Sequence, residues 1–490
     1  MVSEQIVWVK PLDEVTVYVH CEEGVSWELR DHFTFRVPGF QFHPSYRARI
    51  WDGKIRLFDV RSSTIYRGLV KHIEKFCADR NYKFMSEESG DREFSLKEAE
   101  DFIKKLKLPI TPRDYQIEAF VHAIRARRAM LLSPTASGKS LIIYLLVRYL
   151  QNLKSVDNSK KTLIIVPTTS LVSQLYGDFQ DYGYNSKKNV HLIYQGQEKQ
   201  SDLPVVISTW QSLYQLPKAY FEQYDCIIGD EAHLFKAKSL IHIMTSLKNA
   251  KHRFGTTGTL DGTNTHKLVL EGLFGPVHKV TTTKKLMEQK HIADFDIKCL
   301  ILKHSAANCQ ALRKATYNEE IDYLVSNSER NNFIKNLAIS LKGNTLVLFN
   351  YIRHGTELFD LINKERDKNV FYVSGKVKSD DRERIRHLVE KHKNAIIVAS
   401  YGVFSTGVNI QNLHNIIFAS PSKSRIRNLQ SIGRGLRKTK TKTHATLFDI
   451  ADDLRHKSSK NYTLGHFEQR LQIYTDEKFT FRVYKIDLKR

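Results

Sequence analysis

The stretch Ser133-Pro134-Thr135-Ala136-Ser137-Gly138-Lys139-Ser140 has the composition of a phosphate-binding loop. An apolar run over residues 129–132 precedes it and is typical of a buried strand, and an apolar helical run over 141–150 follows. In this setting small residues let backbone N–H groups approach phosphate oxygens, and the helix N-terminus adds partial positive charge. Lys139 would reach the outer phosphates of a nucleotide, and the Ser140 hydroxyl would ligate Mg²⁺. Serine replaces the first glycine of the common pattern, so a tripeptide without function is the alternative for this loop taken alone.

The composition favours a multidomain protein with a polyanionic partner. The 490 residues suggest about three domains, and a hydrophobic content of 41% excludes a disordered chain. Lys and Arg together number 76 against 53 Asp and Glu, a net charge of +23. Solubility alone needs a net charge of only about 2–8 in a small domain, so nucleic acid is the leading partner class.

The scattered cysteines and the lack of a recognisable targeting signal favour a reducing compartment. The five cysteines are scattered and form no C-x-x-C pair, which disfavours a zinc site and a disulfide framework. The N-terminus lacks a basic-then-apolar signal, and no apolar run reaches the about 18 residues that a membrane span needs. We expect a soluble cytoplasmic protein without a membrane partner.

Strands and helices alternate from about residue 109 to 284, which predicts a parallel sheet. The strand candidates are residues 129–132, 162–166, 205–208, 226–229 and 253–256. Asp230-Glu231-Ala232-His233 follows one of them directly. Asp230 is suited to the Mg²⁺ shell, and Glu231 to accepting a proton from the attacking water of an ATPase. A chance Asp-Glu pair in a turn is disfavoured by this position after a strand and downstream of the loop.

A second α/β unit is expected from about 285 to 456. Its strand candidates are residues 346–350, 370–373, 395–399 and 416–419. It ends with Gln430-Ser431-Ile432-Gly433-Arg434-Gly435-Leu436-Arg437, where Arg434 and Arg437 would share one helix face. Two guanidiniums aimed at one point suit a developing phosphoryl charge, and a solvated basic face is the alternative.

Residues 1–108 are expected to form a small α/β domain that contains a cationic hairpin. Asp52-Gly53 is a two-residue turn signal, which would pair Trp51 with Lys54 and Ile50 with Ile55. Alternation then places Ala48, Ile50, Ile55 and Leu57 on an inner face, and Arg47, Arg49, Trp51, Lys54, Arg56 and Phe58 on an outer face. The outer face would suit phosphates and stacked bases. An ordinary solvated hairpin face is the alternative.

The ordered motifs resemble those of superfamily 2 helicases with a DEAH box. Arg113-Asp114-Tyr115-Gln116 resembles the Q motif, residues 134–140 motif I, 167–171 motif Ia, 208–211 motif Ib and Asp230-Glu231-Ala232-His233 motif II. Thr257-Gly258-Thr259 resembles motif III, although the family more often has Ser-Ala-Thr, and residues 346–351, 400–410 and 430–437 resemble motifs IV, V and VI. With the N-terminal Trp51-Asp52-Gly53-Lys54, the chain is most similar to the UvsW-type helicases of T4-like bacteriophages.

This resemblance implies an α/β fold with two tandem RecA-like parallel-sheet domains after a small α/β (α+β) N-terminal domain. The expected boundaries are 1–108, 109–284, 285–456, and 457–490 for a C-terminal helix and tail packed on the second RecA-like domain. It implies an ATP-dependent DNA helicase or translocase that remodels junctions, forks, D-loops and R-loops in recombination, repair and replication-fork rescue. RNA–DNA hybrids, recombination proteins and single-strand-binding proteins are expected as further partners, and the host cytoplasm as the location if a phage encodes the chain.

The resemblance also implies roles for individual residues, with ATP and Mg²⁺ as cofactors. Tyr115 and Gln116 would recognise adenine, and Ser140 and Asp230 would hold Mg²⁺. The expected nucleotide-binding residues are Arg113, Tyr115, Gln116, Thr135, Ala136, Ser137, Gly138, Lys139, Ser140 and Gly407. The expected catalytic residues are Lys139, Asp230, Glu231, Gln430, Arg434 and Arg437. The expected nucleic-acid contacts are Arg47, Arg49, Trp51, Lys54, Arg56, Thr169, Thr209, Ser374 and Thr406, mostly to phosphates.

Two other functions are compatible with parts of the pattern. A translocase subunit of a restriction or defence system usually carries or recruits a nuclease, and neither end region contains a convincing nuclease cluster of carboxylates and lysine. A non-catalytic nucleic-acid clamp on a helicase scaffold would have lost a catalytic group, whereas Lys139, Asp230 and Glu231 are all present.

Overall fold

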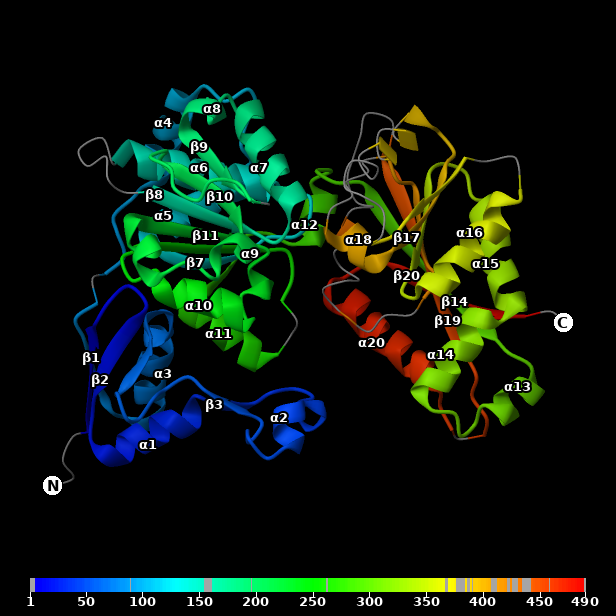
Figure 1. Cartoon of the computed structure of the whole chain (residues 1–490), viewed down its shortest axis with the longest axis horizontal. Helices are drawn as coiled ribbons and strands as arrows, with labels where there is room; N and C mark the ends of the chain where they lie inside the picture. The colour runs from blue at the N-terminus through cyan, green and yellow to red at the C-terminus, as the bar shows by residue number, and fades with distance from the viewer. Residues whose placement is uncertain are drawn as a thin grey trace. The chain divides into compact units, whose positions relative to one another are not determined.

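The structure is a computed structural model of the chain. It describes residues 5–88, 90–153, 161–194, 196–260, 263–365, 369–375, 384–385, 388–389, 391–406, 412–420, 424, 431–433, 442–457 and 459–488, without the side chains at 264–265 and 404–406. This chain divides into two compact units (Figure 1). One comprises Met1–Ser133 and Gly138–Val280, and the other Pro134–Ser137 and Thr281–Arg490. Among the described residues, no helix combines the length and the apolar character needed to cross a membrane.

The first unit contains a parallel sheet, as the alternating pattern predicts. In the described residues it has seven strands in the order β13-β7-β12-β11-β8-β10-β9. They are β7 (Arg128–Leu132), β8 (Lys161–Val166), β9 (Val190–Ile193), β10 (Val205–Thr209), β11 (Tyr224–Asp230), β12 (His252–Thr257) and β13 (Val277–Lys279). The central strands are buried along almost their whole length, which is why their sequences read as continuous apolar runs. The short edge strands β9 and β13 were not predicted.

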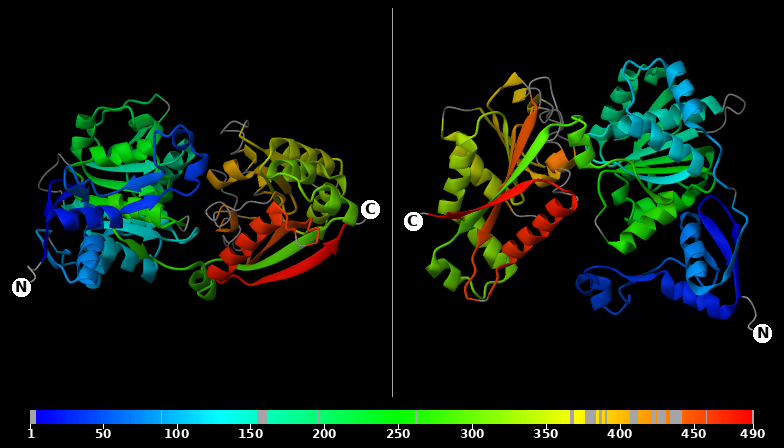
Figure 2. Two further views of the ribbon diagram at one scale, coloured as in Figure 1. Left: turned by 90° about the horizontal axis from the view of Figure 1, so that it is seen from below. Right: turned by 180° about the vertical axis from the view of Figure 1, so that it is seen from behind.

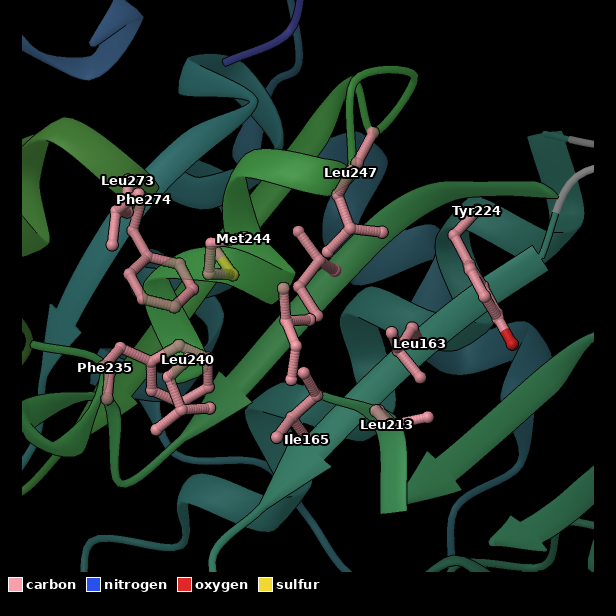
Figure 3. Packing of buried hydrophobic residues seen from close by; sticks show 14 of the residues in the cluster. Leu163, Ile165, Leu213, Tyr224, Phe235, Leu240, Met244, Leu247, Leu273 and Phe274 are labelled. Atoms are coloured by element: carbon pink, nitrogen blue, oxygen red, sulfur yellow. The ribbon is translucent and has the colours of Figure 1, made fainter. Parts of the chain in front are cut away.

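Helices cover both faces of this sheet (Figure 1). Those of the first α/β region are α5 (Asp114–Ala126), α6 (Lys139–Leu153), α7 (Thr169–Asp181), α8 (Ser186–Asn189), α9 (Trp210–Leu213), α10 (Lys238–Ser246) and α11 (Asn264–Phe274), with 3₁₀ turns η3 (Lys218–Gln223) and η4 (Ala232–Leu234). Figure 3 shows Leu163 and Ile165 of β8 in one buried cluster with Leu240 and Met244 of α10. This packing fixes the sheet edge that carries the candidate site.

The second unit contains another parallel sheet, which confirms the tandem RecA-like architecture. Among the described residues it has seven strands in the order β16-β17-β15-β18-β19-β14-β20. They are β14 (Asp294–Lys303), β15 (Thr345–Phe349), β16 (Val370–Val373), β17 (Ile396–Ser400), β18 (Asn415–Phe418), β19 (His444–Asp453) and β20 (Phe481–Asp487). The helices are α12 (Thr283–Glu288), α13 (Ala306–Ala311), α14 (Tyr317–Ser326), α15 (Ser328–Ser340), α16 (Ile352–Asn363), α18 (Tyr401–Thr406) and α20 (Tyr462–Asp476). The C-terminal strand β20 joins this sheet beside β14.

The N-terminal region forms a small α/β domain, as predicted. Its described sheet has the order β5-β2-β1-β6, with β1 (Ile6–Pro11), β2 (Thr16–His20), β5 (Thr64–Tyr66) and β6 (Lys83–Ser86). Helices α1 (Glu23–His32) and α3 (Val70–Arg80) and the 3₁₀ turn η2 (Arg67–Leu69) accompany it, and α4 (Leu96–Leu106) follows. A capping box begins α4, since the Glu98 N–H donates to Ser95 Oγ and the Ser95 N–H to a Glu98 carboxylate oxygen.

This small domain packs closely on the first α/β region, and the two belong to the same unit. A Cβ added at Gly68 would collide with the Glu271 carbonyl oxygen, and one at Gly272 would lie 2.8 Å from the Tyr66 ring. His72 Nε2 lies 3.0 Å from the Glu271 carboxylate. Backbone contact of this kind, reinforced by a partly buried polar pair, makes the small domain and the first motor domain one body.

The predicted hairpin around Asp52-Gly53 is wrong in its partner strand. Strand β4 (Lys54–Arg56) pairs antiparallel with β3 (Thr34–Arg36), with Phe35 opposite Ile55. The intervening chain forms a 3₁₀ turn η1 (Phe40–Phe42) and a short helix α2 (Pro44–Arg47). Asp52 makes a local turn of a different kind, since its carboxylate accepts the Lys54 N–H at 3.1 Å, and Lys54 pairs with Arg36 and not with Trp51.

The faces predicted from this hairpin are wrong for the same reason. Pro44 starts a helix whose first turn is capped by the His43 ring, which accepts the Ser45 N–H at 3.2 Å, so the residues before the turn are not extended. Ile50, expected on the inner face, is 82% exposed, and Phe58, expected on the outer face, is 1% exposed. Tertiary pairing with β3 has overridden the local period of two.

Candidate functional site

The candidate phosphate-binding loop joins β7 to α6, as predicted. The Ser133 N–H donates to the Thr257 carbonyl at 2.8 Å, which ties the start of the loop to β12. Ser137 Oγ donates to the Pro134 carbonyl at 2.6 Å. Ala136 and Gly138 have φ of +67° and +80°, so alternating backbone conformations curl the loop into a concave nest for an anion. Lys139 Nζ lies 3.5 Å from the Ser133 carbonyl, so the side chain is folded back over the loop. It would have to move away from this carbonyl to contact a phosphate.

The Q-motif residues hold this loop from α5. The Arg113 N–H donates to Gln116 Oε1 at 2.9 Å, and Gln116 Nε2 donates to the Gly138 carbonyl at 3.3 Å. Gly138 has φ of +80°, a backbone conformation that favours glycine, and a Cβ there would also displace the Gln116 amide. Arg113 Nη1 donates to the Tyr115 hydroxyl at 2.7 Å, and the Tyr115 ring is buried. The structure thus brings Arg113, Tyr115 and Gln116 to the phosphate-binding loop.

The acidic pair lies at the carboxyl end of β11, which borders β12. Asp230 Oδ1 accepts a hydrogen bond from Thr256 Oγ1 at 2.7 Å. Burial raises the pKa of Asp230, the Glu231 charge raises it further, and the nearby Lys139 ammonium opposes both. The Asp230 and Glu231 carboxylates and the Ser140 hydroxyl at the start of α6 are oxygen donors of the kind that a hard cation such as Mg²⁺ prefers.

His233 connects the acidic pair to the next strand. Its Nδ1 lies 3.3 Å from Glu231 Oε2 and 3.0 Å from Thr257 Oγ1. The Thr257 hydroxyl also donates to the Thr259 carbonyl at 3.0 Å. Glu231 itself has φ of +49°, which turns its side chain out of the strand direction. Sequence reasoning placed these residues in motifs II and III but assigned no role to His233, Thr256 or Thr257.

Tyr182 is a site residue that sequence reasoning missed altogether. Tyr182 directly follows α7, and its hydroxyl lies 2.8 Å from Ser140 Oγ. Tyr144 of α6 reaches the Tyr182 carbonyl at 3.4 Å, and Arg148 Nη1 donates to the Tyr144 hydroxyl at 2.7 Å. No motif flags Tyr182, because its proximity to Ser140 arises only when α7 packs beside α6.

A groove of about 600 Å³ brings together the two predicted strand contacts of the first unit, Thr169 and Thr209. Thr169 begins α7 after β8, and Thr209 ends β10, so both lie at the sheet edge that also carries Asp230. Tyr194, Gln197, Lys199 and Gln211 line the same groove and were not predicted. Hydroxyls, amides and an ammonium are the donors that proteins use to hold a nucleic-acid backbone.

The N-terminal arginines gather around a second concavity of about 760 Å³, although their hairpin is not the predicted one. Its lining residues are Gln41, Tyr46, Arg47, Arg49, Ile50, Trp51, Asp52 and Arg56. Arg56 forms an ion pair with Asp52, and Trp51 Nε1 donates to the Lys54 carbonyl at 2.8 Å. Lys54 lies in the adjoining strand β4.

Fewer of the predicted residues can be placed in the second unit. Ser374 follows β16 and is 3% exposed. The side chain of Thr406, and all of Gly407, Gln430, Arg434 and Arg437, lie outside the described residues. Their roles therefore stay predictions.

Comparisons with known proteins identify the family. Three family models match: "DNA helicase UvsW, N-terminal" over residues 7–87, "Type III restriction enzyme, res subunit" over 109–262 and "Helicase conserved C-terminal domain" over 329–439. The "ATP-dependent DNA helicase uvsW" of Enterobacteria phage T4 is 39% identical over 96% of this chain and 98% of its own. The chain belongs to the UvsW family of helicases. As a UvsW-type helicase of superfamily 2, it is an ATP-hydrolysing enzyme.

Solved structures agree with this assignment. The crystal structure of T4 UvsW matches 99% of this UvsW-family chain and 100% of its own, with 37% identity and a TM-score of 0.52. A DNA-bound Type ISP restriction-modification enzyme, LlaBIII, matches 84% of the chain but 34% of its own, with a TM-score of 0.58. At 16% identity that likeness concerns the fold alone. The restriction family model likewise matches only the first motor domain, whereas the UvsW relation includes the N-terminal domain.

Proposed function

We propose that this UvsW-family helicase couples ATP hydrolysis to movement along a DNA strand and remodels branched DNA, in recombination, repair and replication-fork rescue. The supporting observation is that one unit carries two separate surfaces suited to binding nucleic acid. They are the groove of Thr169 and Thr209, and the arginine-lined concavity of Arg47 and Arg49. A branched substrate offers a single strand and a duplex together, so an enzyme that acts on it needs one surface for each.

The chemistry assigned to the loop and the acidic pair is phosphoryl transfer to water. Lys139 would swing from the Ser133 carbonyl to the terminal phosphates, and backbone N–H groups of the nest would bind phosphate oxygens. Glu231, oriented by His233, would accept a proton from the attacking water. Bound by oxygens of Ser140 and Asp230, Mg²⁺ would supply positive charge to the phosphates. Arg434 and Arg437 would stabilise charge in the transition state, with Gln430 as a further catalytic residue, and Gly407 would contact the nucleotide.

Coupling to DNA is proposed through the common sheet edge. The carboxyl ends of β8 and β10 support the strand groove, and that of β11 carries the acids. Thr169, Thr209, Ser374 and Thr406 would contact phosphates of the strand, so binding would be independent of sequence. We further propose that RNA–DNA hybrids are substrates, that recombination and single-strand-binding proteins are partners, and that the enzyme works in the cytoplasm of a phage-infected host.

ATP hydrolysis tests this function directly. Wild type and Lys139→Ala are compared with single-stranded DNA, a four-way DNA junction, duplex RNA or no nucleic acid. We expect the junction to give the strongest stimulation, and Lys139→Ala to abolish it, because the ammonium is needed for the phosphates. Stimulation by RNA alone would replace the proposal with RNA remodelling. Hydrolysis without any nucleic-acid dependence would argue against coupled movement.

A further inference from the structure

The tip of the N-terminal domain, residues 39–53, presents apolar side chains to solvent. Ile50 is 82% exposed and Phe42 is 69% exposed, the two highest values among the large hydrophobic side chains of the described residues. Leaving such a side chain in water is unfavourable compared with burying it. Both lie in the connection between β3 and β4, in a segment that carries none of the ATP-binding motifs.

The backbone holds Ile50 outward, so its exposure is built into the fold. The Ile50 N–H donates to the Ser45 carbonyl at 2.9 Å, and the Trp51 N–H donates to the same carbonyl at 3.2 Å. Arg49 has φ of +57°, a conformation that favours glycine and that turns the chain sharply just before Ile50. Trp51 then anchors the segment, with its ring 5.2 Å from that of His43 and its N–H on the Lys54 carbonyl.

Cationic groups surround the exposed isoleucine. Arg47, Arg49 and Arg56 line the same concavity as Ile50, with Asp52 as the acidic member that pairs with Arg56. A bare apolar patch would fit a protein partner, but an exposed isoleucine among guanidiniums has the composition of a DNA wedge. In such wedges arginines hold phosphates while an isoleucine, leucine or phenylalanine enters between two base pairs and unstacks them.

We propose that Ile50 is an apolar wedge that enters a base step at the branch point of DNA, while Arg47 and Arg49 hold the flanking phosphates. This inference rests on the proposed function, since it names how the N-terminal surface engages branched DNA. Branch points are the favoured place for it, because one side of the step is already unpaired and unstacking it there costs least. The small domain is packed on the first motor domain, so the wedge is carried by the same body as the strand groove.

The test measures base unstacking separately from binding. A DNA three-way junction carries 2-aminopurine at the branch point, and a second version carries it in the middle of one arm. Fluorescence at saturating protein reports unstacking, and anisotropy of the same DNA gives the dissociation constant. The variants are Ile50→Ala and Ile50→Leu, with Leu96→Ala as the control, since Leu96 is 49% exposed at the start of α4 and belongs to no arginine cluster.

We expect wild type, Ile50→Leu and Leu96→Ala to raise the branch-point fluorescence, and Ile50→Ala to lose roughly half or more of that rise, while its dissociation constant changes less than about threefold because phosphate contacts dominate affinity. A full rise with Ile50→Ala would overturn the wedge. So would an equal loss at the arm position, which would indicate that Ile50 acts through general binding and not at the branch point. Junction-stimulated ATP hydrolysis by wild type is measured in parallel. A lack of this stimulation would contradict the proposed function, whereas stimulation without the Ile50 effect would contradict only the wedge.

Discussion

The Nδ1 atom of His233 lies 3.0 Å from the hydroxyl oxygen of Thr257 and 3.3 Å from a carboxylate oxygen of Glu231. One buried imidazole therefore contacts both the candidate general base and the end of β12. Thr257 in turn receives the Ser133 N–H on its carbonyl, so the same residue also touches the start of the phosphate-binding loop. A displacement of the loop at Ser133 can therefore reach Glu231 through the side chains of Thr257 and His233.

Replacing Thr257 by valine tests this connection. The change keeps the side-chain shape and removes the hydroxyl that His233 contacts. We expect DNA stimulation of ATP hydrolysis to fall about 5- to 10-fold, with a smaller change in the basal rate, since a coupling energy of about 1 kcal/mol corresponds to a factor of about 5. Steady-state hydrolysis with and without a DNA junction measures the ratio. His242→Ala, at an exposed position on α10, is the control, and an unchanged ratio in Thr257→Val would remove His233 from the coupling route.

Tyr182→Phe removes the hydroxyl 2.8 Å from Ser140 Oγ. Without it the serine hydroxyl loses a partner worth about 0.5–1.5 kcal/mol and is less well oriented. We expect the Mg²⁺ concentration for half-maximal ATP hydrolysis to rise about 2- to 10-fold, with little change in thermal stability. Tyr184→Phe is a matched control, because its hydroxyl donates instead to Gln151 at 2.8 Å. If both variants behave alike, Tyr182 has only a packing role.

Arg49→Ala at the tip should weaken DNA binding in a salt-dependent way. Each phosphate contact that is lost reduces the slope of log affinity against log salt by about 1. Anisotropy titrations of junction DNA over a range of salt concentrations measure that slope, with the exposed Arg61→Ala of the same domain as the control. An unaltered slope in Arg49→Ala would show that the arginine-lined concavity does not contact phosphates.

Acid should destabilise the second unit through His354. This side chain is fully buried between Ser420 and Asn331, and burial lowers its pKa to about 3. An unfolded histidine has a pKa near 6.5, so as pH falls below that value the unfolded state takes up a proton first. Stability is therefore complete above pH of about 6.5 and is lost progressively down to pH of about 3, by about 2 kcal/mol at pH 5.

Urea unfolding of wild type and His354→Gln at pH 7.5 and pH 5 measures this loss. The variant is expected to be less stable at pH 7.5, because two hydrogen bonds are altered, but to lose less stability on acidification. The second-unit transition is followed, since two units need not unfold together. Equal losses in the two proteins would assign the acid sensitivity to other groups.

Local sequence patterns predicted the motor fold well. Its central strands are buried on both faces and therefore form apolar runs, and its phosphate-binding loop and acidic pair are recognisable short motifs. Strands β14 and β19 escaped prediction because charged residues interrupt their apolar runs, as in Asp294-Phe295-Asp296. The hairpin predicted at Asp52-Gly53 is wrong because Ile55 pairs with Phe35, which lies well upstream, where no local signal points to it. The same limit explains Tyr182 and Thr257, which reach the site only through the packing of α7 and β12.

The meeting of Gly68 with Glu271 and of Gly272 with Tyr66 restricts how this protein can change. A side chain at Gly68 would meet backbone atoms of Glu271 and Gly272, which no substitution removes, whereas a side chain at Gly272 would need a smaller residue at Tyr66. A chimaera that joined this N-terminal domain to a foreign motor would need both glycine surfaces grafted together. Gene exchange between related phages is therefore expected to transfer the two domains together, because separating them would disrupt this interface.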